Sequence, residues 1–237
     1  YAFTSQEMLF SIDDFSNRFV KPAMVALANK IDSVGYSTIM NSIYNQNGTP
    51  GTPLTTATAR DAVLQAAATL YNNDAPVDDG MLHCINTPGF NAILSGSNAA
   101  LFNPQKEVSE IYVKGMQGEF GGFTHYMSQN VLGHTVGVYG GTPLTNSATA
   151  QTGSSLITDG WTPTTTVLKA GDVITIDGVN AVNPQTKVDL GFLQQFVVTA
   201  DSVTDGSGNS TLAISPAIVT TGGTQNVTNG AANNKAI

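Results

Sequence analysis

The stretch from Ser11 to Tyr44 constrains the fold most, because its pattern predicts one helical run much longer than an average helix. Its apolar residues recur at spacings of 4, 3, 4 and 3 and therefore share one helix face: Val20, Met24, Leu27, Ile31 and Val34. If the whole stretch is helical, it is about 50 Å long. We therefore expect an extended rod that braces the rest of the chain.

The first residues of this run predict the start of a helix, and a proline lies in its interior. Ser11 is a good N-cap, and Asp14 can reach back to it in an acidic variant of the capping box. Pro22 removes one helical hydrogen bond, so we expect a kink there, or a short helix that ends before a longer one begins at Pro22. If the apolar stripe is buried, replacing Leu27 by Asp should leave the protein insoluble or unassembled.

The first 115 residues read as α+β. Residues 1–10 alternate like a strand, residues 45–58 form a Gly/Pro/Thr loop, and residues 98–114 are expected to be helical in part. Thr58 and Asp61 form a second capping pair, before a helix whose stripe is Ala59, Val63, Ala66 and Leu70. A buried strand at 81–85 then leads through Thr87, a predicted N-cap, into a short helix that stops at Gly96.

The composition of the chain changes after Gly115, where Gly, Thr and Val become the commonest residues. Strands are predicted at 118–127, 154–158, 165–169, 172–177, 192–200 and 210–215, each flanked by turn residues. Short strands at regular spacing are typical of a small sandwich or barrel. We place the boundary between the two halves in the Gly/Thr/Ser-rich residues 130–150.

Charge is scarce and unclustered. Only 11% of residues are charged, the net charge is −8, and the lysines and arginines are scattered singly. This argues against a surface that grips nucleic acid or anionic membranes, because both need clustered cations. No apolar run approaches the roughly 20 residues that cross a bilayer. A surface of hydroxyls and amides suits either close approach to another protein or a secreted, β-rich domain.

No pattern for catalysis or metal binding was found. Ser97 and Ser207 do not lie in a nucleophile elbow, and the histidines (His83, His125 and His134) lack zinc-ligand spacing. His125 reads as a hydrogen-bonded strand histidine, and the single cysteine, Cys84, as a small buried hydrophobe. A hairpin turn explains Asp205-Gly206, and a solvated loop explains Asp78-Asp79. We therefore predict no enzyme activity and no catalytic, cofactor-binding or metal-ligating residue.

Three stretches resemble the major capsid (coat) proteins of tailed double-stranded-DNA bacteriophages, in particular the podovirus type with an inserted β-domain. They are FSIDDFSNRFVKPAMVALANKID, YVKGMQGEFGGFTHYMSQNVLGHTVG and LKAGDVITIDGVNAVNPQTKVDLGFLQQFVVTADSVTDGSGNSTLAISPAI. The third is the most specific, with its Gly-Asp turn, NPQTK loop, QQFVVTA strand and closing strand into Ser215-Pro216. The resemblance covers most of residues 9–218.

The resemblance implies a partial tailed-phage capsid fold of the α+β class, with a peripheral domain, an axial domain and an inserted small β-barrel domain. Residues 1–10 would end the extended loop, and residues 11–130 would supply parts of the peripheral and axial domains, with the spine helix at 11–44. Residues 131–222 would be the inserted β-barrel domain, and residues 223–237 a flexible return segment. The family pattern extends beyond both ends, so we expect an incomplete chain.

The resemblance also implies a structural, non-enzymatic subunit that assembles into an icosahedral shell around double-stranded DNA. Its partners would be further copies of itself in hexamers and pentamers, scaffolding and portal proteins by analogy, and packaged DNA without sequence-specific contacts. Assembly would take place in the host bacterial cytoplasm, and the product would be the virion. One alternative is a surface or tail-fibre-like protein whose β-domain binds glycans through Trp161. A weaker one is a hydrolase whose site is completed elsewhere.

Overall fold

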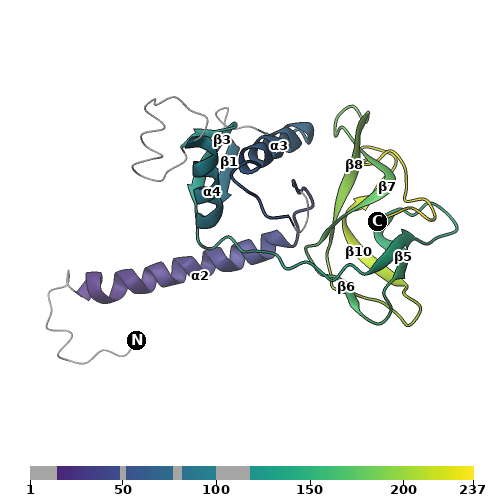
Figure 1. Ribbon diagram of the computed structural model, residues 1–237, viewed down its shortest axis with the longest axis horizontal. Coiled ribbons are helices and arrows are strands. Elements are labelled where there is room, and N and C mark those ends of the chain that lie inside the picture. The colour runs from purple at the N-terminus through teal and green to yellow at the C-terminus, as the bar shows by residue number, and fades with distance from the viewer. Residues whose placement is uncertain (1–14, 49–51, 77–81, 100–117) are drawn as a thin grey trace.

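A computed structural model of the chain describes residues 15–48, 52–76, 82–99 and 118–237. The fold is mixed α+β with a curled antiparallel sheet, so the α+β class predicted from the sequence is confirmed. Figure 1 shows three parts: a long helix, a small α+β lobe beside it, and a β-domain at the end of the helix that is nearer the lobe.

The long helix consists of a π-helical turn, η2 (Ser16–Val20), and the α-helix α2 (Lys21–Met40). Pro22 lies in the first turn of α2, and the backbone stays helical through Val20 and Lys21. The predicted end of a first helix before Pro22 is therefore not seen; the chain changes from π-helical to α-helical hydrogen bonding just before the proline. The 20 residues of α2 span about 30 Å.

The helix is shorter than the predicted run of residues 11–44. It ends at Met40, and residues 41–44 form a turn followed by irregular chain. The hydroxyls of Ser37 and Thr38 both donate to the carbonyl of Val34, at 2.9 and 3.0 Å. Such bonds compete with the helical ladder, which helps to end the helix there.

The α+β lobe packs two helices, α3 (Ala59–Asn72) and α4 (Pro88–Ala99), against a three-stranded sheet. The sheet order is β1 (Leu82–Asn86), β3 (Phe123–Met127) and β2 (Glu119–Phe120), with β1 parallel to β3. The buried core of the lobe is Ala59, Val63, Ala67, Leu82, Leu94 and Phe123. Its helical members follow the predicted stripe of α3 closely.

The helix signals of the lobe had mixed outcomes. Thr87 caps α4 as predicted, since its hydroxyl accepts the N–H of Phe90 at 3.1 Å. The predicted capping pair of Thr58 and Asp61 is wrong, because the Thr58 hydroxyl accepts the N–H of Thr55 at 3.0 Å instead. Helix α4 also continues past Gly96 to Ala99.

The β-domain contains a five-stranded antiparallel sheet of order β4-β5-β10-β8-β7. Its strands are β4 (Gly141–Thr145), β5 (Gly153–Trp161), β10 (Ser210–Ile218), β8 (Asp189–Val198) and β7 (Val173–Val182). Two short strands, β6 (Thr166–Leu168) and β9 (Ser202–Val203), pair separately. All the strands predicted after residue 150 are present, whereas β4 lies in the segment predicted to be a boundary.

The segment 223–237, predicted to be a flexible return, is packed against the β-domain. Val227 and Ala231 are fully buried in its core. Val227 forms a bridge with Ala181 of β7, and Ala236 forms one with Leu144 of β4. The tail thus pairs with both edge strands of the curled sheet. This corrects the prediction, and the reason is that the tail covers sheet edges that would otherwise be exposed.

Several predictions lie outside the described residues. These are the strand at 1–10, the cap at Ser11 and Asp14, the turn at Asp78-Asp79, and most of the partial helix at 98–114.

Candidate assembly surface

No side chain of helix α2 is fully buried in the described part of the chain. The predicted stripe is exposed along its whole length: Val20 43%, Met24 59%, Leu27 54%, Ile31 63% and Val34 51%. The described residues therefore do not bury the stripe. Leu27→Asp is accordingly expected to leave folding intact, while its effect on assembly stays a prediction.

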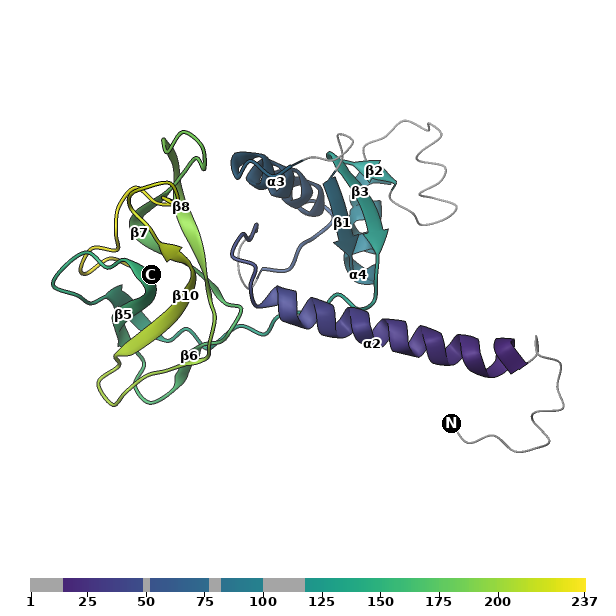
Figure 2. The same cartoon turned by 180° about the vertical axis from the view of Figure 1, so that it is seen from behind.

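The opposite side of α2 faces its own chain and is mainly polar. Asn29, Ser33, Tyr36 and Met40 are partly buried, and they follow one another at spacings of 4, 3 and 4. With 3.6 residues per turn, this set lies opposite the apolar stripe. The Asn130 amide donates to Asn29 at 3.4 Å, which places residues after β3 along this side. Figure 2 shows the lobe on one side of α2 and no described element on the other.

This arrangement reverses the usual one for a surface helix, in which apolar residues face the core. An exposed apolar stripe beside a polar inner face is typical of a helix that a second molecule covers. We therefore treat the stripe as the candidate assembly surface of the chain.

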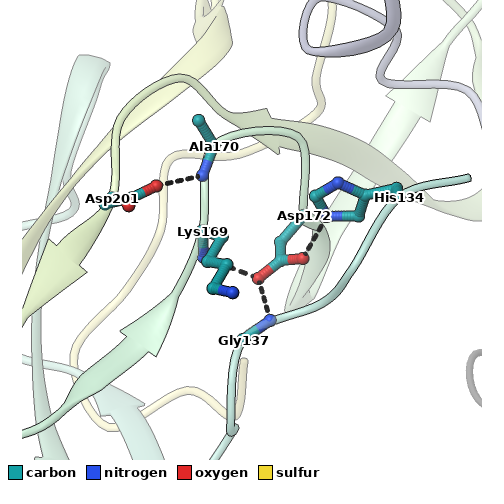
Figure 3. A network of polar contacts seen from close by, with 6 residues as sticks. All are labelled: His134, Gly137, Lys169, Ala170, Asp172 and Asp201. Atoms are coloured by element: carbon teal, nitrogen blue, oxygen red, sulfur yellow. Dashed lines mark hydrogen bonds and ion pairs between the residues drawn. The ribbon is translucent and has the colours of Figure 1, made fainter. Parts of the chain in front are cut away.

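The β-domain is joined to the lobe by residues 128–140, which we call the connecting segment. Asp172, only 5% exposed, fastens this segment to the β-domain (Figure 3). Its carboxylate accepts the N–H of Lys169 at 2.7 Å, the N–H of Gly137 at 3.0 Å and the imidazole Nε2 of His134 at 2.6 Å. A buried carboxylate with three donors is a strong local anchor.

A second polar contact joins the β-domain to the chain after α2. The side-chain amide of Gln195 accepts the N–H of Gln46 at 2.8 Å and donates to the carbonyl of Gln46 at 2.8 Å. One side chain thereby satisfies both backbone groups of a residue 149 positions away. Together with the Asp172 anchor, this contact holds the β-domain at a defined position relative to α2.

A recess of about 550 Å³ lies between these two contacts. Its lining is mostly apolar and comes from the end of α2, the connecting segment and the β-domain; it includes Met40, Ile43, Val136, Tyr139, Leu168 and Ile174. Its titratable groups include His134 and Asp172, which bind each other. We interpret the recess as part of the junction between the parts of the chain.

The candidate residues weighed in the sequence do not converge on one site. His125 is hydrogen-bonded within the sheet as predicted, with Nδ1 3.0 Å from Asn86 Nδ2 and Nε2 3.2 Å from the Phe120 carbonyl. Burial lowers the pKa of His125, and the hydrogen bond that its ring makes to the Phe120 carbonyl opposes this only in part. His83 instead contacts the ring of Tyr126, with centroids 5.7 Å apart.

Cys84 and Trp161 have structural environments. Cys84 is partly buried against the lobe core, its thiol donates to Asn86 at 3.0 Å, and burial raises its pKa. Trp161 is 3% exposed, donates its indole N–H to Thr158 at 2.8 Å, and meets Tyr139 edge to face. The residue on which a glycan-binding role was based is therefore part of the core.

Asp205-Gly206 lies in a turn as predicted, but the turn does not close a hairpin, because β9 pairs with β6 while β10 pairs with β5 and β8. The Asp205 carboxylate accepts the side-chain N–H of Asn209 and the backbone N–H groups of Asn209 and Ser207, and these bonds lower its pKa. Sequence reasoning identified the Lys169–Asp172 turn but missed the burial of Asp172, whose partners His134 and Gly137 lie 38 and 35 residues away. No local signal could have identified them.

None of the helices in the described part of the chain combines the length and hydrophobicity that a membrane crossing requires. The sequence matches no protein-family model and no curated protein.

Proposed function

We propose that this chain is the major capsid subunit of a tailed double-stranded-DNA bacteriophage, a non-enzymatic protein that assembles with copies of itself into an icosahedral shell. The observation that carries the proposal is the orientation of α2. The helix exposes an apolar stripe and presents a polar side to its own chain. Such a helix stabilises its subunit little and is suited to contacts between subunits.

Other features support the same function. In this proposal α2 is the spine helix of the peripheral domain, the α+β lobe contributes to the peripheral and axial domains, and the curled sheet is the inserted β-barrel domain. A surface with few charges suits a protein repeated many times in one particle, because like charges on every copy would repel. A net charge of −8 suits a container that encloses DNA without gripping it.

The proposed localisation is the virion, after assembly in the host bacterial cytoplasm. The proposed partners are further copies in hexamers and pentamers and, by analogy, scaffolding and portal proteins. Packaged DNA would make no sequence-specific contacts.

Electron microscopy of the native material that contains this chain tests the proposal. We expect closed icosahedral particles whose main protein component carries this sequence. A discrete monomer that binds glycans or turns over a substrate would overturn it. Analytical ultracentrifugation of the same material provides an independent measure of particle mass.

A further inference from the structure

A small polar recess lies between the α+β lobe and the β-domain. Its volume is about 290 Å³, and its walls come from the chain just after α2, the C-terminal end of α3, and strands β7 and β8. Figures 1 and 2 both show α3 as the element of the lobe nearest to β8. Every lining residue belongs to the described part of the chain; most carry side-chain amides, two are threonines, and none of them is charged. We call this site the amide recess.

Hydrogen bonds to main-chain carbonyls fix the orientation of two amides in the recess. The side-chain nitrogen of Gln194 donates to the carbonyl of Gln195 at 2.8 Å, which leaves the side-chain oxygen of Gln194 as a spare acceptor. In the same way, the side-chain nitrogen of Asn73 donates to the carbonyl of Thr69 at 2.8 Å and leaves its oxygen spare. Neither oxygen accepts a hydrogen bond from a described residue. The amide recess therefore holds two acceptors whose positions are set in advance.

The burial of Gln194 is the observation that points to a ligand. Gln194 is only 8% exposed, and a buried polar atom without a hydrogen-bond partner is rare in folded proteins because it destabilises them. A donor from outside the chain would satisfy its oxygen. Asn45, which also lines the recess, is partly buried, and its side chain makes no hydrogen bond to a described residue. The recess thus combines unused acceptors with an unused amide that can donate.

The lining selects a neutral ligand that carries hydroxyl groups. No lining residue is a cation that could hold a phosphate or a carboxylate, and the net charge of −8 disfavours anions further. A side-chain amide both donates and accepts, so it can bind two adjacent hydroxyls. Phe192, 41% exposed, and Leu193, 36% exposed, supply an apolar wall for the C–H face of a sugar ring. The volume lies at the lower end of the roughly 300–1,000 Å³ of ligand pockets, which suits a single ring.

We propose that the amide recess binds one ring of a neutral saccharide. The side-chain oxygens of Gln194 and Asn73 would accept hydrogen bonds from ring hydroxyls, the amide of Asn45 would donate to one, and Phe192 would pack against the ring. This site is separate from Trp161, which is buried in the core of the β-domain. The inference goes beyond the proposed function and does not depend on it.

Saturation-transfer-difference NMR with the whole chain tests the proposal, because the method detects weak binding. The probes are neutral oligosaccharides built from glucose, galactose, mannose or N-acetylglucosamine, together with sialylated and sulfated counterparts. Uridine and triglycine serve as probes of other chemical classes. We expect at least one neutral saccharide to bind with a Kd of about 1 mM, as is reasonable for a ligand of one ring. Its acidic counterparts should bind about tenfold more weakly, because the recess offers them no cation.

Three variants assign the binding to this recess. Gln194→Met keeps a side chain of similar length but removes the acceptor, and Phe192→Ala removes the apolar wall; each should weaken binding about tenfold. Asn72→Ala removes an exposed amide of the recess and should weaken binding about threefold. Tyr71→Ala is the matched control, because Tyr71 precedes Asn72 on α3 and is 53% exposed but does not line the recess. It should leave the affinity unchanged within about twofold.

The proposal is overturned if no neutral saccharide binds, if uridine or triglycine binds more tightly than every saccharide, or if Phe192→Ala and Tyr71→Ala have equal effects. Circular dichroism and Trp161 fluorescence establish that each variant is folded. Saccharide binding and shell formation are measured separately. Closed particles that bind no neutral saccharide would refute this inference and leave the proposed function intact, whereas a discrete monomer that binds one through Gln194 and Phe192 would do the reverse.

Discussion

Replacing Asp172 by Ala should destabilise the β-domain while leaving the α+β lobe unaffected. The substitution leaves the N–H groups of Gly137 and Lys169 and the imidazole of His134 without their acceptor. Hydrogen bonds to charged groups contribute about 1.5–3 kcal/mol each, which gives roughly 5–9 kcal/mol for three. Water can replace part of this, because the His134 side chain is 24% exposed. We therefore expect the free energy of unfolding to fall by about 3 kcal/mol.

Trp161 makes the assay specific to the β-domain, because it is the only tryptophan in the chain and lies in the core of that domain. With a urea m-value of about 1.5 kcal/mol/M, a loss of about 3 kcal/mol lowers the unfolding midpoint by about 2 M. The lobe has its own reporter in Cys84, the only cysteine, which is partly buried and hydrogen-bonded to Asn86 in the folded lobe and becomes accessible to thiol reagents when the lobe unfolds. Its labelling midpoint in urea should stay unchanged in Asp172→Ala.

Asp201→Ala is the matched control for this experiment. Asp201 lies next to the same turn and accepts one N–H, that of Ala170, at 2.9 Å, but it is exposed (Figure 3). Its loss should cost no more than about 1 kcal/mol. Two results would show that Asp172 does not anchor the connecting segment. One is an equal shift of the Trp161 unfolding transition in Asp172→Ala and Asp201→Ala. The other is a loss of less than about 1 kcal/mol in Asp172→Ala.

Three further variants test other parts of the structure. Gly137→Ala would place a Cβ 2.4 Å from the Val167 carbonyl oxygen and should cost about 2–3 kcal/mol in the Trp161 assay, whereas Gly133→Ala, with open space around it, should be neutral. Val227→Ala should cost about 2 kcal/mol in the same assay, because Val227 is fully buried; no change would mean that the tail is as flexible as the sequence suggested. The pKa of His125 is lowered in the folded lobe, so only the unfolded state gains a proton readily as the pH falls below about 6.5. Stability of the lobe should therefore be retained above that pH and decline below it, and His125→Asn should flatten this dependence in urea titrations followed by circular dichroism; an unchanged pH dependence would refute it.

Local patterns predicted the elements whose residues carry their own signal. The strands after residue 150 alternate apolar and polar residues between Gly, Asp and Asn turns, and both the pattern and the turns are local. The helix at 59–72 has a clear apolar stripe. Strand β4 was missed because its sequence, GTPLT, contains Gly and Pro and offers one large apolar residue, Leu144.

Features that depend on distant partners could not be predicted from the sequence. The tail 223–237 contributes Val227 and Ala231 to the core, but its Asn, Gly and Thr residues resemble a loop until the edges of β4 and β7 are in place. The burial of Asp172 depends on a connecting segment that begins more than 30 residues earlier. Likewise, the periodicity of α2 identified which residues share a face but not whether the chain itself covers that face.

The exposure of α2 has an energetic consequence for the proposed role. Most of the stability of a helix in a protein comes from tertiary packing of its apolar face rather than from the intrinsic propensity of its residues. Here that face is exposed, and the contacts to its own chain are those of a partly buried polar side. A molecule that covers the apolar stripe would therefore both bind α2 and stabilise it, and part of the binding free energy would offset the cost of ordering the helix. The rod is thus the part of the subunit whose stability should respond most to a neighbour, as expected of the element that links one subunit to the next.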